Sequence, residues 1–218
     1  MGKLVIFITY VINKILIRGV KMIKNLKVYR QALIIVDMVN GFVREGVLHD
    51  EQIAKIIPRQ LELLEENKKR NGLTIFIKDT HEANSTEFKR FNNTQHCIKG
   101  TTEQELVEEL KPWEKMDDTI SIEKNSTSYM EAPAFRKLIS NLSNLEQVDV
   151  VGCCTDICVA NGTIALANYF DQHNLPVKIR VHEDAIATYD EQERQENVKA
   201  AKLLMTGQGI QLVKKGGK

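Results

Sequence analysis

The sequence is poor in the residues and patterns that mark several large protein classes. Four cysteines in 218 residues are too few for a disulfide scaffold, and three of them lie within positions 153–158, so we expect a reducing, cytoplasmic setting. Only four prolines and no low-complexity segment leave no sign of a linker. The apolar run near the N-terminus breaks at Asn13 and Lys14, well short of the about 20 residues that a membrane-spanning helix needs.

Charge of one sign is also missing. The chain has 30 Lys and Arg against 29 Asp and Glu, so no overall field draws it to nucleic acid or to anionic membranes, and we expect neither as a partner. Seven of the basic residues and none of the acidic ones lie in the first 30 positions, which makes the remainder mildly acidic. A hydrophobic share of 43% is ordinary for a globular protein and excludes general disorder.

The first 21 residues differ from the rest in composition and allow three interpretations. They resemble a short export signal, but no small-x-small cleavage site follows. They mix lysine with apolar residues as an interfacial anchor does. Alternatively, translation starts at Met22 and the segment is not part of the native protein. We predict an N-terminal extension over residues 1–21 and a single domain over 22–218, with a membrane contact only if the extension is genuine.

Apolar runs rich in β-branched residues alternate with segments of helical spacing. We predict strands over 32–37, 73–79, 119–123, 147–153, 177–184 and 210–213. We predict helices over 53–64, 157–171 and 191–204, with glycines at 72, 207 and 209 acting as helix stops. This alternation predicts a parallel α/β sheet covered on both faces, in which ligands bind at the carboxyl ends of the strands.

Three of those strand ends carry residues suited to nucleophilic chemistry: Asp37, Lys124 and Cys158. Cys158 falls in the first turn of a predicted helix, where backbone N–H groups and a nearby lysine favour a thiolate. Each residue also has a structural interpretation, because Cys158 suits a buried strand–helix junction, Asp37 suits a cap and Lys124 suits a solvated surface. Cys153 and Cys154 continue an apolar strand.

The second strand ends in an Asp-x-His pattern that suggests a divalent metal. Asp79 and His81 lie on one side of an extended strand end, and His96 follows in a loop. Glu87 lies between them and is a candidate fourth ligand. The alternative is that these are solvated loop residues. No phosphate loop, dinucleotide fingerprint or complete zinc-protease motif is present.

Five segments taken together resemble the isochorismatase-like cysteine hydrolases of the nicotinamidase type. They are VDMVNGF, KDTH, QHCIKGT, EKNSTSY and GCCTDICV, and the resemblance spans about 32–213. It implies a three-layer α/β/α fold with a mainly parallel sheet of about six strands. It also implies an Asp37, Lys124 and Cys158 triad that hydrolyses an amide through a thioester.

The same resemblance implies the remaining parts of a site. Backbone N–H groups of Cys154 and Cys158 would hold the oxyanion, and a cis peptide would precede Cys154. Asp79, His81 and His96, with Glu87 as a candidate, would bind zinc, iron or manganese, and Phe42 would flank the ring of nicotinamide. A homo-oligomer acting on a small-molecule amide is expected.

The sequence departs from the family pattern around the pocket. Val39 and Gly41 stand where glutamine and aspartate are common, and residues 127–130 replace a Tyr-Ser-Ala-Phe run. Two alternatives therefore stay open. One keeps the nucleophile and changes the substrate to another small amide, a ureide or a vinyl ether. The other is a non-catalytic binding or redox module whose thiols respond to oxidants.

Overall fold

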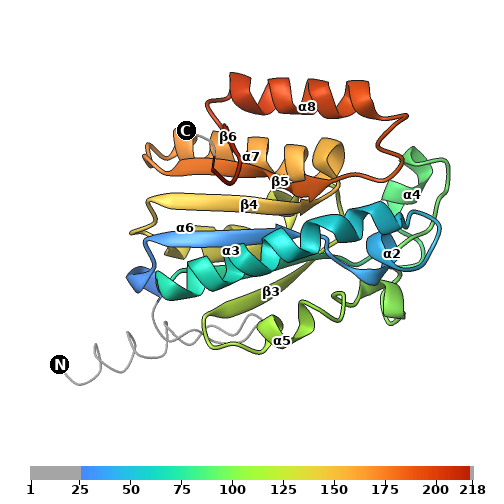
Figure 1. The fold of residues 1–218 in the computed structure, drawn as a ribbon, viewed down its shortest axis with the longest axis horizontal. Helices are drawn as coiled ribbons and strands as arrows, with labels where there is room; N and C mark the ends of the chain where they lie inside the picture. The colour runs from blue at the N-terminus through green and yellow to red at the C-terminus, as the bar shows by residue number, and fades with distance from the viewer. Residues whose placement is uncertain (1–25, 217–218) are drawn as a thin grey trace, which may run out of the picture.

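The computed structural model describes residues 26–216, and its core is a six-stranded sheet in which all neighbouring strands are parallel (Figure 1). The strands follow the spatial order β3-β2-β1-β4-β5-β6. Their bounds are β1 (Gln31–Val36), β2 (Leu73–Asp79), β3 (Thr119–Lys124), β4 (Gln147–Cys153), β5 (Lys178–Ala187) and β6 (Gln211–Val213). The predicted parallel sheet is confirmed. The extension predicted over 1–21 lies outside the described residues.

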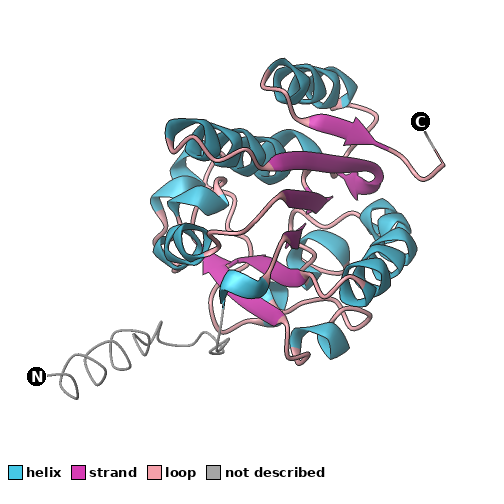
Figure 2. Ribbon diagram, turned by 90° about the vertical axis from the view of Figure 1, so that its left-hand side faces the viewer, coloured by secondary structure: helices cyan, strands magenta, loops and turns pink. Residues whose placement is uncertain are grey.

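Helices cover both faces of this sheet (Figures 1 and 2). Side chains alternate along β1, so that Ala32 and Ile34 enter one buried core while Leu33 and Ile35 enter the other. The first core is closed by α6 (Pro133–Asn141), α7 (Ala160–Gln172) and α8 (Gln195–Gly207). The second is closed by α2 (Asn40–Val43), α3 (Ile57–Lys69) and α5 (Lys111–Glu114). The α/β/α layering is therefore confirmed.

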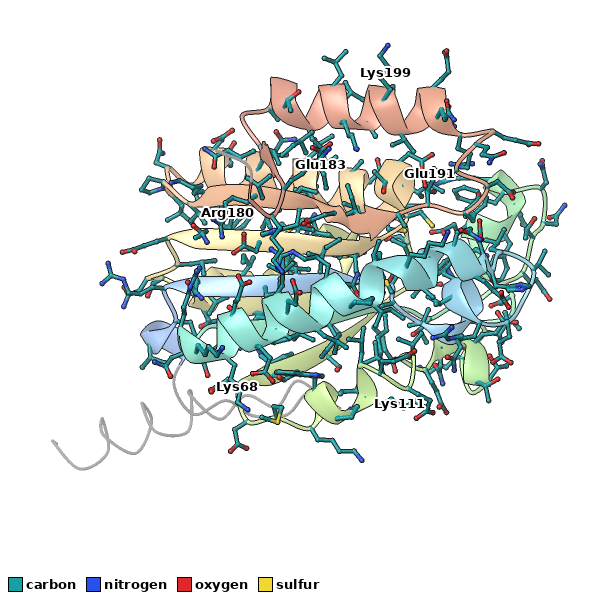
Figure 3. The ribbon with its side chains drawn as sticks, in the orientation of Figure 1. Lys68, Lys111, Arg180, Glu183, Glu191 and Lys199 are labelled. Carbon is teal, nitrogen blue, oxygen red and sulfur yellow. The ribbon has the colours of Figure 1, made fainter. Side chains whose placement is uncertain are left out.

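Shorter elements complete the connections. The helix α4 (Thr86–Arg90) lies in the loop after β2. Short turns of 3-10 helix are η1 (Leu26–Val28), η2 (Glu51–Ile56), η3 (Thr102–Gln104) and η4 (Tyr129–Glu131), and a π-helical turn, η5 (Thr155–Val159), follows β4. The labelled Lys199 and Lys111 point outward from α8 and α5 (Figure 3). None of the helices in residues 26–216 combines the length and hydropathy that crossing a bilayer requires.

Some boundaries differ from the predicted ones for identifiable reasons. The last helix starts at Gln195 instead of 191, because Asp190 takes a left-handed conformation (φ 47°) and its carbonyl accepts the N–H of Arg194 in a turn. β5 continues to Ala187, because its pairing with β4 shifts register after Val150–Val181 and resumes at Gly152–Ile186 and Cys153–Ala187. The left-handed residue after α3 is Asn71 (φ 55°), not Gly72.

The carboxyl ends of β1, β2, β3 and β4 lie at the same edge of the sheet. Asp37 directly follows β1, and its backbone N–H donates to the carbonyl of Ile77 in β2 at 2.9 Å. Asp79 and Lys124 are paired across the last rung of β2 and β3. Gly152 in β4 has a φ of 120°, and any side chain there would collide with the Val36 backbone, so β1 and β4 approach closely just before this edge.

Candidate active site

A buried lysine joins side chains from three other elements at this edge. The Lys124 Nζ lies 2.7 Å from Asp79 Oδ1, 2.9 Å from Asp37 Oδ2 and 3.5 Å from Cys158 Sγ. Burial alone would lower the pKa of Lys124, but the two carboxylates raise it well above its usual range. The structure thus brings Asp37 and Cys158 of the expected triad to its third member, Lys124, whose charged form the two carboxylates favour.

Asp37 has properties suited to accepting a proton. It is fully buried, and its backbone is left-handed (φ 52°), a strained conformation of the kind found at working sites. Burial raises the pKa of Asp37 to about 6, with a further contribution from the Asp79 charge, although Lys124 opposes the shift. At neutral pH the carboxylate is mostly ionised, and it becomes protonated as the pH falls through about 6.

Cys158 lies in η5, immediately after the strand that ends at Cys153. Its side chain is 5% exposed, and burial raises the pKa of the thiol well above its usual range, while Lys124 opposes that effect. The resting group is therefore a neutral thiol that needs a base beside it to become nucleophilic. The peptide bond between Cys153 and Cys154 is cis, at the position that the family resemblance implies.

A second cluster adjoins Lys124 through Asp79. Asp79, His81, Glu87 and His96 place their ligand atoms within 4.8 Å of one another, and all four are buried. His81 Nε2 lies 3.0 Å and His96 Nε2 lies 3.3 Å from Asp79 Oδ2, whereas Glu87 Oε1 lies 3.7 Å from His81 Nε2. The four residues come from the end of β2, from α4 and from the loop that follows α4.

The hydrogen bonds of the two imidazoles fit a bound cation. His81 Nδ1 contacts Asn125 Oδ1 at 2.7 Å, and His96 Nδ1 contacts the carbonyl oxygen of Thr94 at 3.0 Å. Because a carbonyl oxygen only accepts, each Nδ1 carries the proton and each Nε2 of a neutral ring turns its lone pair toward the carboxylates. Lone pairs and negative oxygens converging on one point suit a divalent metal, and two imidazoles with carboxylates suit zinc, iron or manganese.

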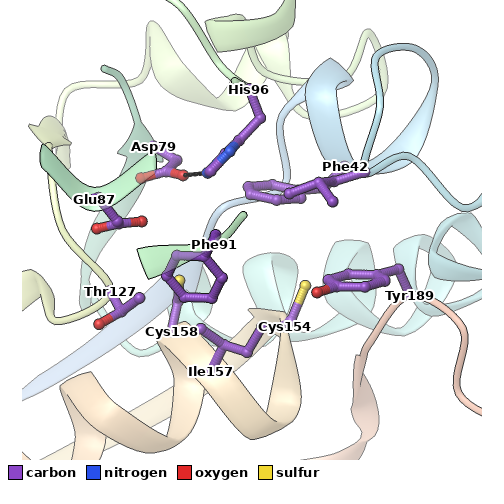
Figure 4. Close-up of a pocket in the computed structure, with 11 residues that line it drawn as sticks. Phe42, Asp79, Glu87, Phe91, His96, Thr127, Cys154, Ile157, Cys158 and Tyr189 are labelled. Carbon is purple, nitrogen blue, oxygen red and sulfur yellow. Dashed lines mark ion pairs between the residues drawn. The ribbon is translucent and has the colours of Figure 1, made fainter. Parts of the chain in front are cut away.

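A pocket that is partly open to solvent lies over both clusters (Figure 4). Asp79 and His96 border it on one side and Cys158 lies at its base. Its walls are mainly apolar and include Phe42. The other lining residues are Leu48, Glu87, Phe91, Thr127, Cys154, Ile157 and Tyr189.

Several of these residues escaped prediction from the sequence. Leu48, Phe91 and Tyr189 come from loops, where apolar residues have no periodic pattern that assigns them to a pocket. Tyr189 is held in place by Arg194, whose guanidinium carbon lies 4.7 Å from the ring centroid and which also binds Asp156 of η5 at 2.5 Å. Asn125 could have been recognised as a candidate site residue, because it directly follows Lys124 in the sequence.

Comparisons with known proteins agree with this geometry. A model of the isochorismatase domain family matches residues 31–210. Nicotinamidase 1 of Arabidopsis thaliana is 30% identical over 174 residues, which cover 72% of this chain and 69% of that protein.

Solved structures share the fold. A nicotinamidase from Bacillus subtilis superposes with a TM-score of 0.69 at 23% identity, covering 84% of this chain and 99% of that one. N-carbamoylsarcosine amidase from Thermoplasma acidophilum gives 0.68 at 20% identity, covering 87% and 98% of the two chains. The pyrazinamidase of Pyrococcus horikoshii in complex with zinc gives 0.67 at 23% identity, covering 85% and 99%.

Proposed function

Because the chain belongs to the isochorismatase domain family of hydrolases, we propose that it is a metal-dependent cysteine amidohydrolase that converts nicotinamide to nicotinate and ammonia. One observation carries the proposal: Lys124 contacts Asp37, Cys158 and Asp79. Asp79 also belongs to the second cluster, called here the metal-type cluster, which consists of Asp79, His81, Glu87 and His96. A single pocket thus offers a nucleophile for a carboxamide and, beside it, a cation site for a ring nitrogen.

The first half of the reaction follows from the protonation states at rest. Asp37 takes the proton of the Cys158 thiol, and the thiolate attacks the amide carbon to form a C–S bond. Lys124 stays protonated and stabilises the charged pair. The oxyanion is held by the backbone N–H groups of Cys154 and Cys158. Asp37 then gives its proton to the amide nitrogen, the C–N bond breaks, and ammonia leaves a thioester.

Water completes the cycle through the same base. Asp37 takes a proton from a water molecule, and the resulting hydroxide attacks the thioester carbon. The C–S bond breaks, the carboxylic acid product leaves, and Cys158 recovers a proton from Asp37. The pocket's apolar walls limit the entry of other water molecules, which strengthens the electrostatic interactions of Lys124 during both halves.

The metal-type cluster would orient the substrate. Asp79, His81 and His96, with Glu87 as the candidate fourth ligand, would hold a divalent ion such as zinc, whose open position would accept the lone pair of a pyridine nitrogen. Phe42 would pack against the ring between that nitrogen and the carboxamide. Its ring centroid already lies 5.7 Å from that of His96, so it borders the same part of the pocket.

The experiment that tests this function follows ammonia release from nicotinamide. Purified protein is compared with Cys158→Ala, and both are measured after chelation and after reloading with zinc, iron or manganese. We expect turnover that requires both Cys158 and a metal, with an unchanged melting temperature in the variant. No release from metal-loaded wild type would reject nicotinamide and direct the search to other small amides, ureides or vinyl ethers. Turnover that persists in Cys158→Ala would reject the nucleophile.

A further inference from the structure

The loop that carries His96 is held by a hydrogen bond at the next residue, Cys97. The backbone N–H of Cys97 donates a hydrogen bond of 2.7 Å to Glu103 Oε2. Cys97 is fully buried and has a left-handed backbone (φ 46°), a conformation that a non-glycine residue adopts only when its surroundings hold it. The Glu103 carboxylate therefore supports a strained turn next to a candidate metal ligand, through a charge-assisted bond.

The same turn is bonded to the second histidine of the cluster. The His81 backbone N–H donates to the Cys97 carbonyl at 2.9 Å, and the Lys99 N–H donates to the His81 carbonyl at 2.8 Å. These bonds form a parallel bridge between His81 and Ile98. A shift of Cys97 would thus move the backbones that carry both imidazoles.

The space around Glu103 is closed by two glycines of the segment that follows β1. A Cβ atom at Gly41 would lie 2.7 Å from the Cys97 Sγ and 3.1 Å from the Glu103 Cβ. A Cβ atom at Gly46, where φ is 91°, would lie 2.9 Å from the Glu103 carboxylate. Both glycines are needed for this close approach. The segment holding Phe42 therefore packs directly on the carboxylate that supports Cys97.

We infer that Glu103 is a positioning residue for the metal site. Its bond to the Cys97 N–H fixes the position of the adjacent residue His96. Through the bridge between His81 and Ile98, the same bond also fixes the position of His81. This inference rests on the proposed metal-dependent function, but it concerns residues outside the ligand set. Because groups that orient metal ligands typically contribute 10–100-fold to metal affinity, the loss of Glu103 has a measurable consequence in binding alone.

The test is a titration of the metal-free full-length protein with Co²⁺ and with Zn²⁺. We expect Glu103→Ala to weaken binding by about 10-fold or more and to change the visible absorption of the Co²⁺ form. Glu103→Gln keeps an oxygen that accepts the Cys97 N–H, so it should restore affinity to within about 3-fold of wild type. Glu105→Gln is the matched control, because the Glu105 carboxylate contacts Lys111 at the surface, and it should bind as wild type does.

Gly41→Ala is a second substitution that disturbs the turn at Cys97. Its added methyl group would press on the Cys97 Sγ without removing any polar group, and it should also weaken metal binding. The inference would be overturned if Glu103→Ala and Gly41→Ala bound the metals as tightly as wild type. It would also be overturned if the metal affinity of Glu103→Gln were no higher than that of Glu103→Ala. A wild type that binds neither metal would instead overturn the proposed metal site, and the inference with it.

Discussion

Lys124 is the residue on which the two clusters of the site depend. Its ammonium pairs with two buried carboxylates, and one of these, Asp79, uses Oδ1 for Lys124 while its Oδ2 faces the imidazoles. Burying several charges is stable only when each has a partner. The proposed catalytic groups and the metal-type cluster therefore form one continuous charge network.

Removing this ammonium should cost stability as well as activity. Lys124→Met leaves Asp37 and Asp79 without their cation, so we expect the free energy of unfolding at pH 7 to fall by about 3 kcal/mol or more. Urea denaturation of the metal-free protein measures the change. Lys215→Met, which breaks an exposed pair with Glu62, is the control and should cost less than about 1 kcal/mol. Equal losses in the two variants would contradict the network.

The raised pKa of Asp37 predicts the pH dependence of turnover. Only the ionised carboxylate accepts a proton, so kcat/KM should rise with pH and level off above about 6, the pKa of this group in the free enzyme. A pH–rate profile with nicotinamide checks this. The profile should lose its acidic limb in Asp37→Asn, whose residual activity would be lower and flat across that range.

The residues brought together at the site were identifiable from the sequence to different degrees. Asp37, Asp79 and Lys124 follow recognisable strands, and parallel strands deliver their carboxyl ends to one edge. Glu103 and Tyr189 have no such signal. Glu103 reaches Cys97 through a non-periodic turn, and Tyr189 depends on a distant contact between Arg194 and Asp156. Periodicity predicts which face a side chain occupies, but not which loops fold onto each other.

At the level of secondary structure, β4 and β5 are linked by a polar cluster on the α3 side of the sheet. Asp149 in β4 accepts hydrogen bonds from Arg180 at 2.7 and 2.8 Å and from His182 at 2.9 Å. Figure 3 shows Arg180 lying across this face. This charged cluster interrupts the hydrophobic pattern, and so do Glu183 and Asp184 of β5. Both strands were predictable nevertheless, because Val148 and Val150 in β4 and Ile179 and Val181 in β5 are β-branched and alternate with the polar residues.

This cluster should give the fold a measurable sensitivity to acid. Burial would raise the pKa of Asp149, but its bonds with His182 and Arg180 lower the pKa to about 2. Because the folded pKa is depressed, the contribution is complete above about pH 4 and is lost as the pH falls through about 2. We expect Asp149→Asn to lose about 2 kcal/mol at pH 7 in denaturant unfolding, and less as the pH approaches 2. A difference independent of pH would contradict this role.

The strand and helix boundaries show where sequence patterns end and long-range contacts begin. β2 and β4 have the predicted limits, because their ladder pairing ends at Asp79 and at Cys153, although the residues that follow are still buried. β5 extends three residues beyond its predicted end, since its pairing with β4 resumes after extra residues in β5 shift the register. Whether a strand continues past its hydrophobic run depends on its neighbour, which a single sequence does not contain.

For the whole molecule, a bound metal should appear as added thermal stability. An ion that binds only the folded state at 100 times its Kd contributes about 2.7 kcal/mol. For a chain of this size that corresponds to a rise of roughly 5 to 10 °C in Tm. Calorimetry of chelated and zinc-loaded protein measures it. His96→Ala should lose most of the rise, while a buffer-matched magnesium addition should give little.

We propose that residues 22–218 form a single hydrolase domain that folds without residues 1–21. The contacts of the described chain begin close to this start, because Leu26 packs against the core, Tyr29 hydrogen-bonds Asp118, and the Arg30 carbonyl accepts the Glu146 N–H at 2.8 Å. A variant starting at Met22 should match the full chain in Tm and kcat/KM. A Tm lower by more than about 5 °C would show instead that the first 21 residues pack on the domain.

The strand order also has a consequence for synthesis on the ribosome. β1 occupies the middle of the sheet, yet its partner β4 begins about 110 residues after β1 ends, so at 5–20 residues per second it emerges roughly 5 to 20 s later. Throughout that interval the most apolar strand of the nascent chain has one side unpaired. The half-made protein is therefore the form most in need of chaperone protection, because an open strand edge is a template for aggregation.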